Sequence, residues 1–303
     1  MHRQSAMAHR YLDGLQGIEI GGSAHNPFGL ASWNVDYSGA MDTIFKEEEV
    51  RECGRALPVD VVALGDQLPF RGGSLDYVLT SHVVEHFFDP IRAIAEWHRV
   101  LKPGGLIFCI APHKERTFDA KRDRTPLEEL IARHSGEIPA PEINLQCHHS
   151  VWITEDVLEL CRYLELRVVD FLDVDDKVGN GFTVVIQKAG GSRLEPFSSA
   201  LGQAMHWQNT GQLEAAAQVY QQILLLQPDH SDSLHLLGVL AFQLGRPSDG
   251  LMLIEKAVQY NPRSALYHIN RAKILRTQGR QADADAAYMQ ALGLDAELVF
   301  ATA

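Results

Sequence analysis

The chain has 303 residues, of which 46% are hydrophobic and 22% are charged, with a formal net charge of -12 at pH 7. This composition is typical of a globular protein of about two domains. The acidic balance argues against a nucleic-acid partner, because a phosphate-binding surface needs clustered Lys and Arg. No segment has the apolar length of a signal peptide or membrane span, and the four cysteines form no C-x-x-C pair. We therefore expect a cytoplasmic protein with reduced thiols and no membrane partner.

Apolar strands and amphipathic helices alternate up to about residue 195. Strands are expected at 18–20, 33–36, 61–64, 76–81, 106–112, 167–172 and 181–188, and helices at 90–101 and 154–164. The order predicts an α/β fold with a largely parallel sheet, helices on both faces and an antiparallel last pair of strands. Ligands of such sheets bind beyond the carboxyl ends of the strands, so the polar residues there are candidate site residues.

The pattern changes after A-G-G-S-R-L-E-P, where a repeat with a period of 34 residues begins. The differences 245−211 and 279−245 both equal 34. Glycines recur at this step at Gly211, Gly245 and Gly279, prolines at Pro228 and Pro262, and small residues at Ala216, Gly250 and Ala284. This register is similar to tetratricopeptide repeats over about residues 197–296, which implies an all-α solenoid of three helix pairs.

We therefore expect domains at 1–192 and 197–303, joined by a linker at 193–196. Tetratricopeptide repeats imply a protein partner or self-association. The third repeat lacks its closing Pro, and little sequence follows it for a polar capping helix. Either a partner or second copy covers that end, or the chain is a piece of a longer protein.

Motifs in the first domain follow one another in a specific order. They read G-I-E-I-G-G-S, W-N-V-D-Y, G-D-Q-L-P-F, S-L-D-Y-V and R-V-L-K-P-G-G between residues 17 and 105. In this order they resemble the class I S-adenosylmethionine-dependent methyltransferases, type 11-like, over about residues 10–190. The resemblance implies a Rossmann-like sheet that binds S-adenosyl-L-methionine and releases S-adenosyl-L-homocysteine.

The resemblance also implies which residues contact the cofactor. Glu19 and the glycine turn would line its methionine and ribose, with the helix after that turn offering free N–H groups. Asp36 would accept the ribose hydroxyls, and Asp66 the adenine amine. The full expected set is Glu19, Gly21, Gly22, Ser23, Asp36, Tyr37, Asp66, Gln67, Leu68, Ser81 and His82.

Residues 82–86 read H-V-V-E-H, which is also the inverted zinc-protease motif. That chemistry needs both histidines on one continuous helix, and Asp89-Pro90 leaves no room for one. We therefore interpret the motif as part of the methyl-transfer wall and expect no metal. An alternative is a divalent ion held by His113, His148 and His149 with Asp119, which would orient a diol or sugar acceptor.

Residues 113–152, called the insertion below, follow the expected fifth strand and should form the acceptor pocket. A hydroxyl acceptor must lose its proton, and histidine is a suitable base at neutral pH. The candidate bases are His149 first, His113 second, and then His148 and His86. The final hairpin, with Asp175, Asp176, Lys177 and Asn180, is by default a solvated turn that could close the pocket.

The sequence thus favours a methyltransferase acting on oxygen of a small polar or glycan acceptor. One alternative is a protein or peptide methyltransferase whose repeats hold the substrate. Another is a silent scaffold, against which the intact acidic positions Glu19, Asp36 and Asp66 argue.

Overall fold

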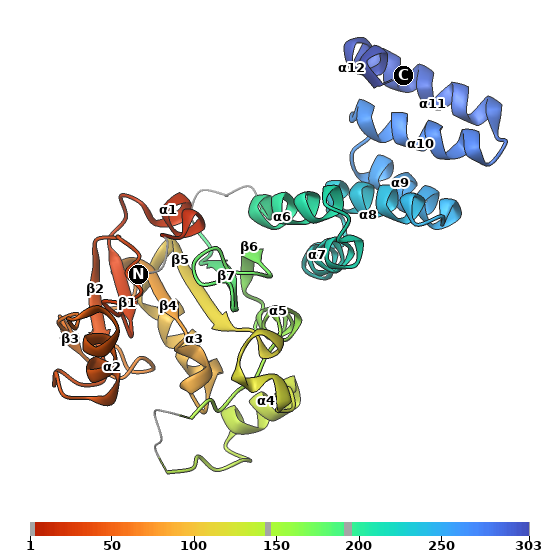
Figure 1. Ribbon diagram of the computed structural model, residues 1–303. Coiled ribbons are helices and arrows are strands. Elements are labelled where there is room, and N and C mark those ends of the chain that lie inside the picture. The colour runs from red at the N-terminus through yellow and green to blue at the C-terminus, as the bar shows by residue number, and fades with distance from the viewer. Residues whose placement is uncertain (1–3, 143–146, 191–195, 303) are drawn as a thin grey trace. The chain divides into compact units, whose positions relative to one another are not determined.

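The computed structural model describes residues 4–142, 147–190 and 196–302. These residues form two compact units that divide between Ser199 and Ala200 (Figure 1). Residues 193–195 of the expected linker and residues 143–146 of the insertion lie outside the described residues.

The first unit is built on a seven-stranded sheet with the order β3-β2-β1-β4-β5-β7-β6. The strands are β1 Gly17–Ile20, β2 Ser32–Asp36, β3 Val61–Val62, β4 Leu75–Ser81, β5 Leu101–Pro112, β6 Arg167–Leu172 and β7 Gly181–Gln187. Strands β1 to β5 pair in parallel, whereas β7 is antiparallel to both β5 and β6. The predicted fold class, with its antiparallel last strand, is confirmed.

Helices cover both faces of this sheet. They are α1 Ala6–Leu12, α2 Ile44–Cys53, α3 Pro90–Val100, α4 Leu127–Ser135 and α5 Thr154–Tyr163, with 3-10 turns η1 Val84–His86, η2 Lys114–Arg116 and η3 Phe118–Lys121. Helix α3 begins at the expected Pro90, and the Asp89 side chain accepts a hydrogen bond from the Arg92 N–H at 3.0 Å. On one face, Met7 and Leu12 of α1 pack into a core with Phe108.

The connection from β1 to β2 corrects one expectation. No helix follows the glycine turn, because the chain runs as a loop from Gly21 to Ala31 before β2 begins. The segment contains Pro27 and Gly29, whose φ of 74° is left-handed, and both residues disfavour a helix. Phe28 anchors the loop in the core at 1% exposure.

The insertion leaves the sheet after β5 and returns beside its starting point, since His113 and Trp152 form an isolated bridge. Its backbone is pinned to η1, because the N–H groups of His149 and Ser150 donate to the Glu85 carbonyl at 2.8 and 3.2 Å. These bonds hold the insertion against the carboxyl end of β4.

The second unit contains the expected helix pairs. Its helices are α6 Ser198–Asn209, α7 Leu213–Leu226, α8 Ser231–Gln243, α9 Pro247–Tyr260, α10 Ala265–Thr277, α11 Gln281–Leu294 and α12 Ala296–Thr302. Small residues let α8 and α9 approach closely, since a Cβ added at Gly250 would lie 2.7 Å from the Gly238 carbonyl oxygen. The short α12 follows the last pair, with its Val299 packed against Ile269. Among the described helices, none is long and apolar enough to cross a membrane.

Candidate cofactor and acceptor site

A cavity of about 460 Å³ opens at the carboxyl ends of β1, β2 and β4. This is where open α/β sheets place ligands, and the volume lies in the usual range for small-molecule sites. The expected site residues that line it are Glu19, Gly21, Gly22, Ser23, Asp36, Tyr37, Ser81, His82 and His86.

Two carboxyl groups stand at the strand ends of the cavity. Burial raises the pKa of Glu19 to about 7, against the opposing effect of the Lys177 and Lys46 ammonium groups. Burial also raises the pKa of Asp36, again opposed by Lys46. The acidic wall is therefore partly desolvated and depends on lysines from other elements for its charge balance.

The glycine turn approaches β2 closely. The Gly22 N–H donates to Asn34 Oδ1 at 3.1 Å, and a Cβ added at Gly22 would lie 2.7 Å from that oxygen. Any larger residue there would require the Asn34 side chain to move. The turn therefore presents bare backbone to the cavity.

A buried ion pair on α2 holds the same loop. Lys46 Nζ donates to Glu49 Oε1 at 2.7 Å, and both side chains are almost completely buried. The other carboxylate oxygen of Glu49 accepts the N–H groups of Ala24 and Leu57 at 3.0 and 2.7 Å. Glu49 thus fixes the loop through side-chain hydrogen bonds, where a helix would have used backbone hydrogen bonds.

The final hairpin also closes on this loop, so the expectation of a solvated turn is wrong. Asp175 and Lys177 are only 1% and 3% exposed. Asp175 accepts four backbone N–H groups of its own turn, and Lys177 Nζ donates to the Pro27 carbonyl at 2.7 Å. Val178 and Asn180 consequently line the cavity.

Asp66, Gln67 and Leu68 do not line the cavity. They border a separate surface hollow, where Asp66 lies 3.4 Å from Arg92 and the Leu68 N–H donates to Glu96 at 2.7 Å. The residues that follow β3 directly, Ala63, Leu64 and Gly65, line the cavity instead. Ala63 and Leu64 were not predicted because the expected strand extended to residue 64, whereas β3 stops at Val62.

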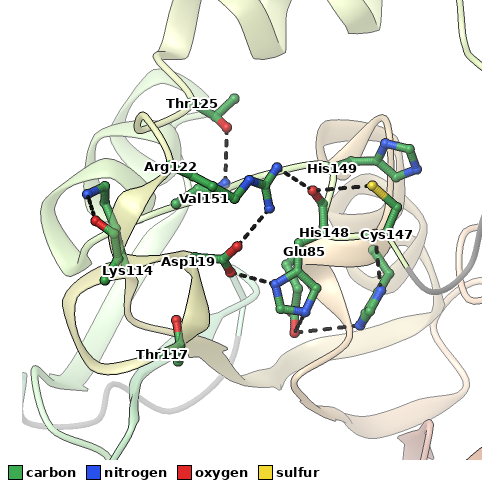
Figure 2. A network of polar contacts seen from close by, with 12 residues as sticks. Glu85, Lys114, Thr117, Asp119, Arg122, Thr125, Cys147, His148, His149 and Val151 are labelled. Carbon is green, nitrogen blue, oxygen red and sulfur yellow. Dashed lines mark hydrogen bonds and ion pairs between the residues drawn. The ribbon is translucent and has the colours of Figure 1, made fainter.

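The four candidate bases lie in different surroundings. His86 lines the cavity, and its ring lies 4.8 Å from that of His148 between centroids. His113 is buried against Phe182, and its Nδ1 accepts the Glu115 N–H at the start of η2. His149 packs on Phe88, with its ring directed away from Glu85 (Figure 2). Neither His113 nor His149 is among the residues that line the cavity.

These surroundings favour the neutral imidazole at His86, His113 and His149. Burial lowers the pKa of His86 to about 4, with His148 adding to the effect. Burial also lowers the pKa of His113 and of His149, assisted by the nearby guanidinium groups of Arg116 and Arg133. A neutral imidazole keeps a lone pair that can accept a proton or bind a metal.

Comparisons with known proteins agree with both halves of this architecture. Residues 21–109 match the family model described as a methyltransferase domain, and residues 265–298 match a tetratricopeptide repeat. This chain joins a methyltransferase domain to tetratricopeptide repeats.

Individual relatives match only part of this chain. An uncharacterized 37.1 kDa protein of a Streptomyces fradiae transposon is 36% identical over 105 residues, covering 33% of this chain and 30% of that protein. A probable S-adenosylmethionine-dependent methyltransferase of Mycolicibacterium smegmatis is 34% identical over 92 residues, covering 30% and 34%. The chain thus spans about a third of the length of these relatives. A crystal structure of MamA has a TM-score of 0.31 and 14% identity, covering 32% of this chain and 57% of that chain.

Within the methyltransferase domain, Glu85 is a buried carboxyl group with three histidines around it. It is fully buried, and burial raises its pKa to about 8, with Asp119 adding to the shift. Glu85 Oε1 lies 3.8 Å from His86 Nε2 and 3.9 Å from both His148 Nε2 and His82 Nδ1. Within the motif H-V-V-E-H, residues Val84–His86 form the three-residue turn η1, so the motif is not a continuous metal-binding helix. The sequence did not predict that His148 lies beside Glu85, because the backbone hydrogen bonds that place it there join segments far apart in the chain.

Proposed function

We propose that the methyltransferase domain binds S-adenosyl-L-methionine in the cavity and transfers its methyl group to an oxygen of a small polar or glycan acceptor. The observation that carries the proposal is the cavity at the carboxyl ends of β1, β2 and β4, walled by Glu19 and Asp36 and floored by the glycine turn. Carboxylates and bare backbone at such strand ends suit a nucleoside with a polar tail.

In this proposal, Asp36 accepts hydrogen bonds from the ribose hydroxyls, and Glu19 lies on the side of the methionine. The adenine is then expected near Ala63, Leu64 and Gly65, which line the cavity next to β3. The apolar side chain of Phe87 lines the same part of the wall.

Methyl transfer forms a bond from the acceptor oxygen to the methyl carbon while the carbon–sulfur bond breaks. Its electron pair returns to sulfur, which becomes the neutral thioether of S-adenosyl-L-homocysteine. Holding acceptor and methyl in line supplies much of the rate, and the acceptor proton must leave. Of the four candidate histidines, His86 is favoured by position because it lines the cavity.

The second part of the proposal concerns the repeat domain. Tetratricopeptide repeats bind protein segments, so we propose that residues 197–303 recruit a protein partner or a second copy of the chain. They would alternatively hold a protein substrate. We also propose a cytoplasmic location, which the free thiols of Cys53, Cys109, Cys147 and Cys161 support.

Labelled S-adenosyl-L-methionine and fractionated lysate test the proposal, using the chain with and without residues 197–303. We expect label in small molecules or glycans with both forms, and no label with Asp36→Ala. Label in protein that requires the repeats would favour the protein methyltransferase instead. Absence of both label transfer and cofactor binding would leave the silent scaffold.

A further inference from the structure

Three metal-binding side chains converge beside the cavity in an arrangement that the proposed methyl transfer does not by itself explain. They are Glu85, His86 and His148, called the Glu85 cluster below, and their ligand atoms all lie within 4.8 Å of one another. Two ligands of one ion at about 2.1 Å are separated by about 3.0 to 3.4 Å at octahedral or tetrahedral angles. The two histidine nitrogens lie 3.8 and 3.9 Å from Glu85 Oε1 and all three atoms within 4.8 Å, so side-chain shifts of about 1 Å bring them to that geometry.

Hydrogen bonds at the far side of each ring orient the two imidazoles. His148 Nδ1 lies 2.6 Å from Asp119 Oδ2, and His86 Nδ1 lies 3.2 Å from the Cys147 carbonyl oxygen. Carbonyl and carboxylate oxygens only accept, so both rings carry their proton on Nδ1. Each Nε2 is therefore the nitrogen that holds the lone pair of the neutral ring, and the two Nε2 atoms lie 3.8 and 3.9 Å from Glu85 Oε1.

The group that faces the two nitrogens is the Glu85 carboxyl, whose oxygens can bind a cation. Glu85 is fully buried, and neither of its carboxylate oxygens accepts a hydrogen bond from another residue in the described part of the chain. A buried carboxyl group facing two imidazole nitrogens needs either a proton or a cation between them, and a metal ion is the cation that all three side chains can bind together.

The surroundings fix this geometry through a second layer of contacts. Asp119, which orients His148, is itself bound by Arg122 at 2.7 Å, and Arg122 also donates to the His148 carbonyl at 2.7 Å (Figure 2). A carboxylate that orients a ligating histidine is a common outer layer of protein metal sites.

From these observations we infer that the Glu85 cluster binds a divalent first-row transition ion such as Zn²⁺, Fe²⁺ or Co²⁺. Two imidazoles and one carboxylate favour such ions over Mg²⁺ and Ca²⁺, which prefer oxygen ligands. Three protein ligands leave at least one coordination position open.

The open coordination position allows the ion to bind the acceptor, a role that rests on the proposed function. His86 belongs both to the cluster and to the cavity wall, so the ion lies at the edge of the cavity. A bound ion lowers the pKa of an acceptor hydroxyl and fixes its oxygen, which favours an acceptor with two neighbouring oxygens. In this arrangement the ion, and not His86, would activate the acceptor, and the acceptor proton would pass to solvent water.

The binding test uses the full chain, stripped with a chelator and titrated with Zn²⁺ and Co²⁺ by equilibrium dialysis. We expect one ion per chain, and at least about 100-fold weaker binding in Glu85→Gln and His148→Gln. Asp119→Asn is expected to weaken binding by about 10- to 100-fold. The matched control is His149→Gln, which removes the neighbouring histidine and should retain wild-type affinity.

Wild-type affinity in both Glu85→Gln and His148→Gln would overturn the site. If those variants do not fold, X-ray absorption of the wild-type zinc form decides. Two imidazole nitrogens with oxygens at about 2.0 to 2.2 Å support the site, and sulfur coordination or a shell without imidazole overturns it.

The open position is tested separately by adding acetohydroxamate, a bidentate oxygen ligand, to the Co²⁺ form. A changed visible spectrum supports an accessible ion, and an unchanged one refutes the acceptor role. Cofactor affinity measured by calorimetry on the same samples separates the two proposals. A wild-type chain that binds the ion but not the cofactor counts against the methyltransferase proposal alone, because ion binding does not require the cofactor.

Discussion

Asp36 and Asp66 follow neighbouring strands and are both acidic, yet only Asp36 lines the cavity. Charge-assisted hydrogen bonds contribute about 1.5 to 3 kcal/mol each, so losing two to a ribose should weaken binding at least about 100-fold. We therefore expect Asp36→Ala to abolish S-adenosyl-L-methionine binding in calorimetry. Asp66→Ala, which removes a carboxylate paired with Arg92, should change affinity less than about threefold. Equal losses of cofactor affinity in both variants would show that Asp66 contacts the adenine after all.

Glu19 gives the methyltransferase domain a pH dependence of defined sign. Its pKa rises from 4.5 to about 7 on folding, because burial disfavours the carboxylate. Both states hold the proton below about pH 4.5, so Glu19 has no effect there. Between about pH 4.5 and 7 the unfolded state ionises first, and the ionised group then costs stability at all higher pH.

Glu19→Gln removes that cost. The free energy of unfolding of the variant relative to wild type should rise from pH 5 to pH 8, as measured by urea denaturation at each pH. The same variant should bind the cofactor more weakly at pH 8, because the carboxylate is lost. A stability difference that does not vary with pH would show that Glu19 is not shifted in this way.

At the scale of elements, the loop between β1 and β2 depends on α2. Removing one partner of a buried ion pair costs about 3 to 5 kcal/mol, because the other charge stays buried. We expect this loss for Lys46→Met in calorimetric unfolding. The matched control is Lys102→Met, whose 2.7 Å pair with Asp76 is half exposed and should contribute less than about 1 kcal/mol. Similar losses in both variants would mean that the Lys46–Glu49 pair does not hold the loop.

Elements with a local signal were predictable from the sequence. Helix α3 shows its start at Pro90 and its apolar face by periodicity, and the 34-residue step reveals the helix pairs through Gly211, Gly245 and Gly279. All three glycines have positive φ, which the repeat requires between its helices.

Elements whose order comes from distant partners were not predictable. The loop after β1 is held by α2 and by the final hairpin, and the sequence suggested a helix there by family resemblance alone. The Glu85 cluster joins residues 63 positions apart (148−85), so no spacing rule points to it. The expected metal alternative named His148 and Asp119, which do meet, but His113 and His149 lie in other surroundings.

At the scale of the whole molecule, two compact units predict two unfolding transitions. Only one unit holds the cavity, so the cofactor at 100 times its Kd should stabilise that unit by about 2.7 kcal/mol. For a domain of this size, that raises the Tm by about 5 to 11 °C. Scanning calorimetry should therefore show one transition that moves with the cofactor and one that does not. A single transition, or an equal shift of both, would contradict independent units.

The bond from Lys177 to the Pro27 carbonyl joins positions that stand 150 residues apart. A ribosome adding about 5 to 20 residues per second makes the second partner roughly 8 to 30 s after the first. During synthesis, the loop between β1 and β2 therefore leaves the ribosome long before the lysine that bonds to it. A nascent chain that stops before Lys177 carries the loop between β1 and β2, whose Ser23, His25 and Asn26 line the cavity, without the bond that holds Pro27.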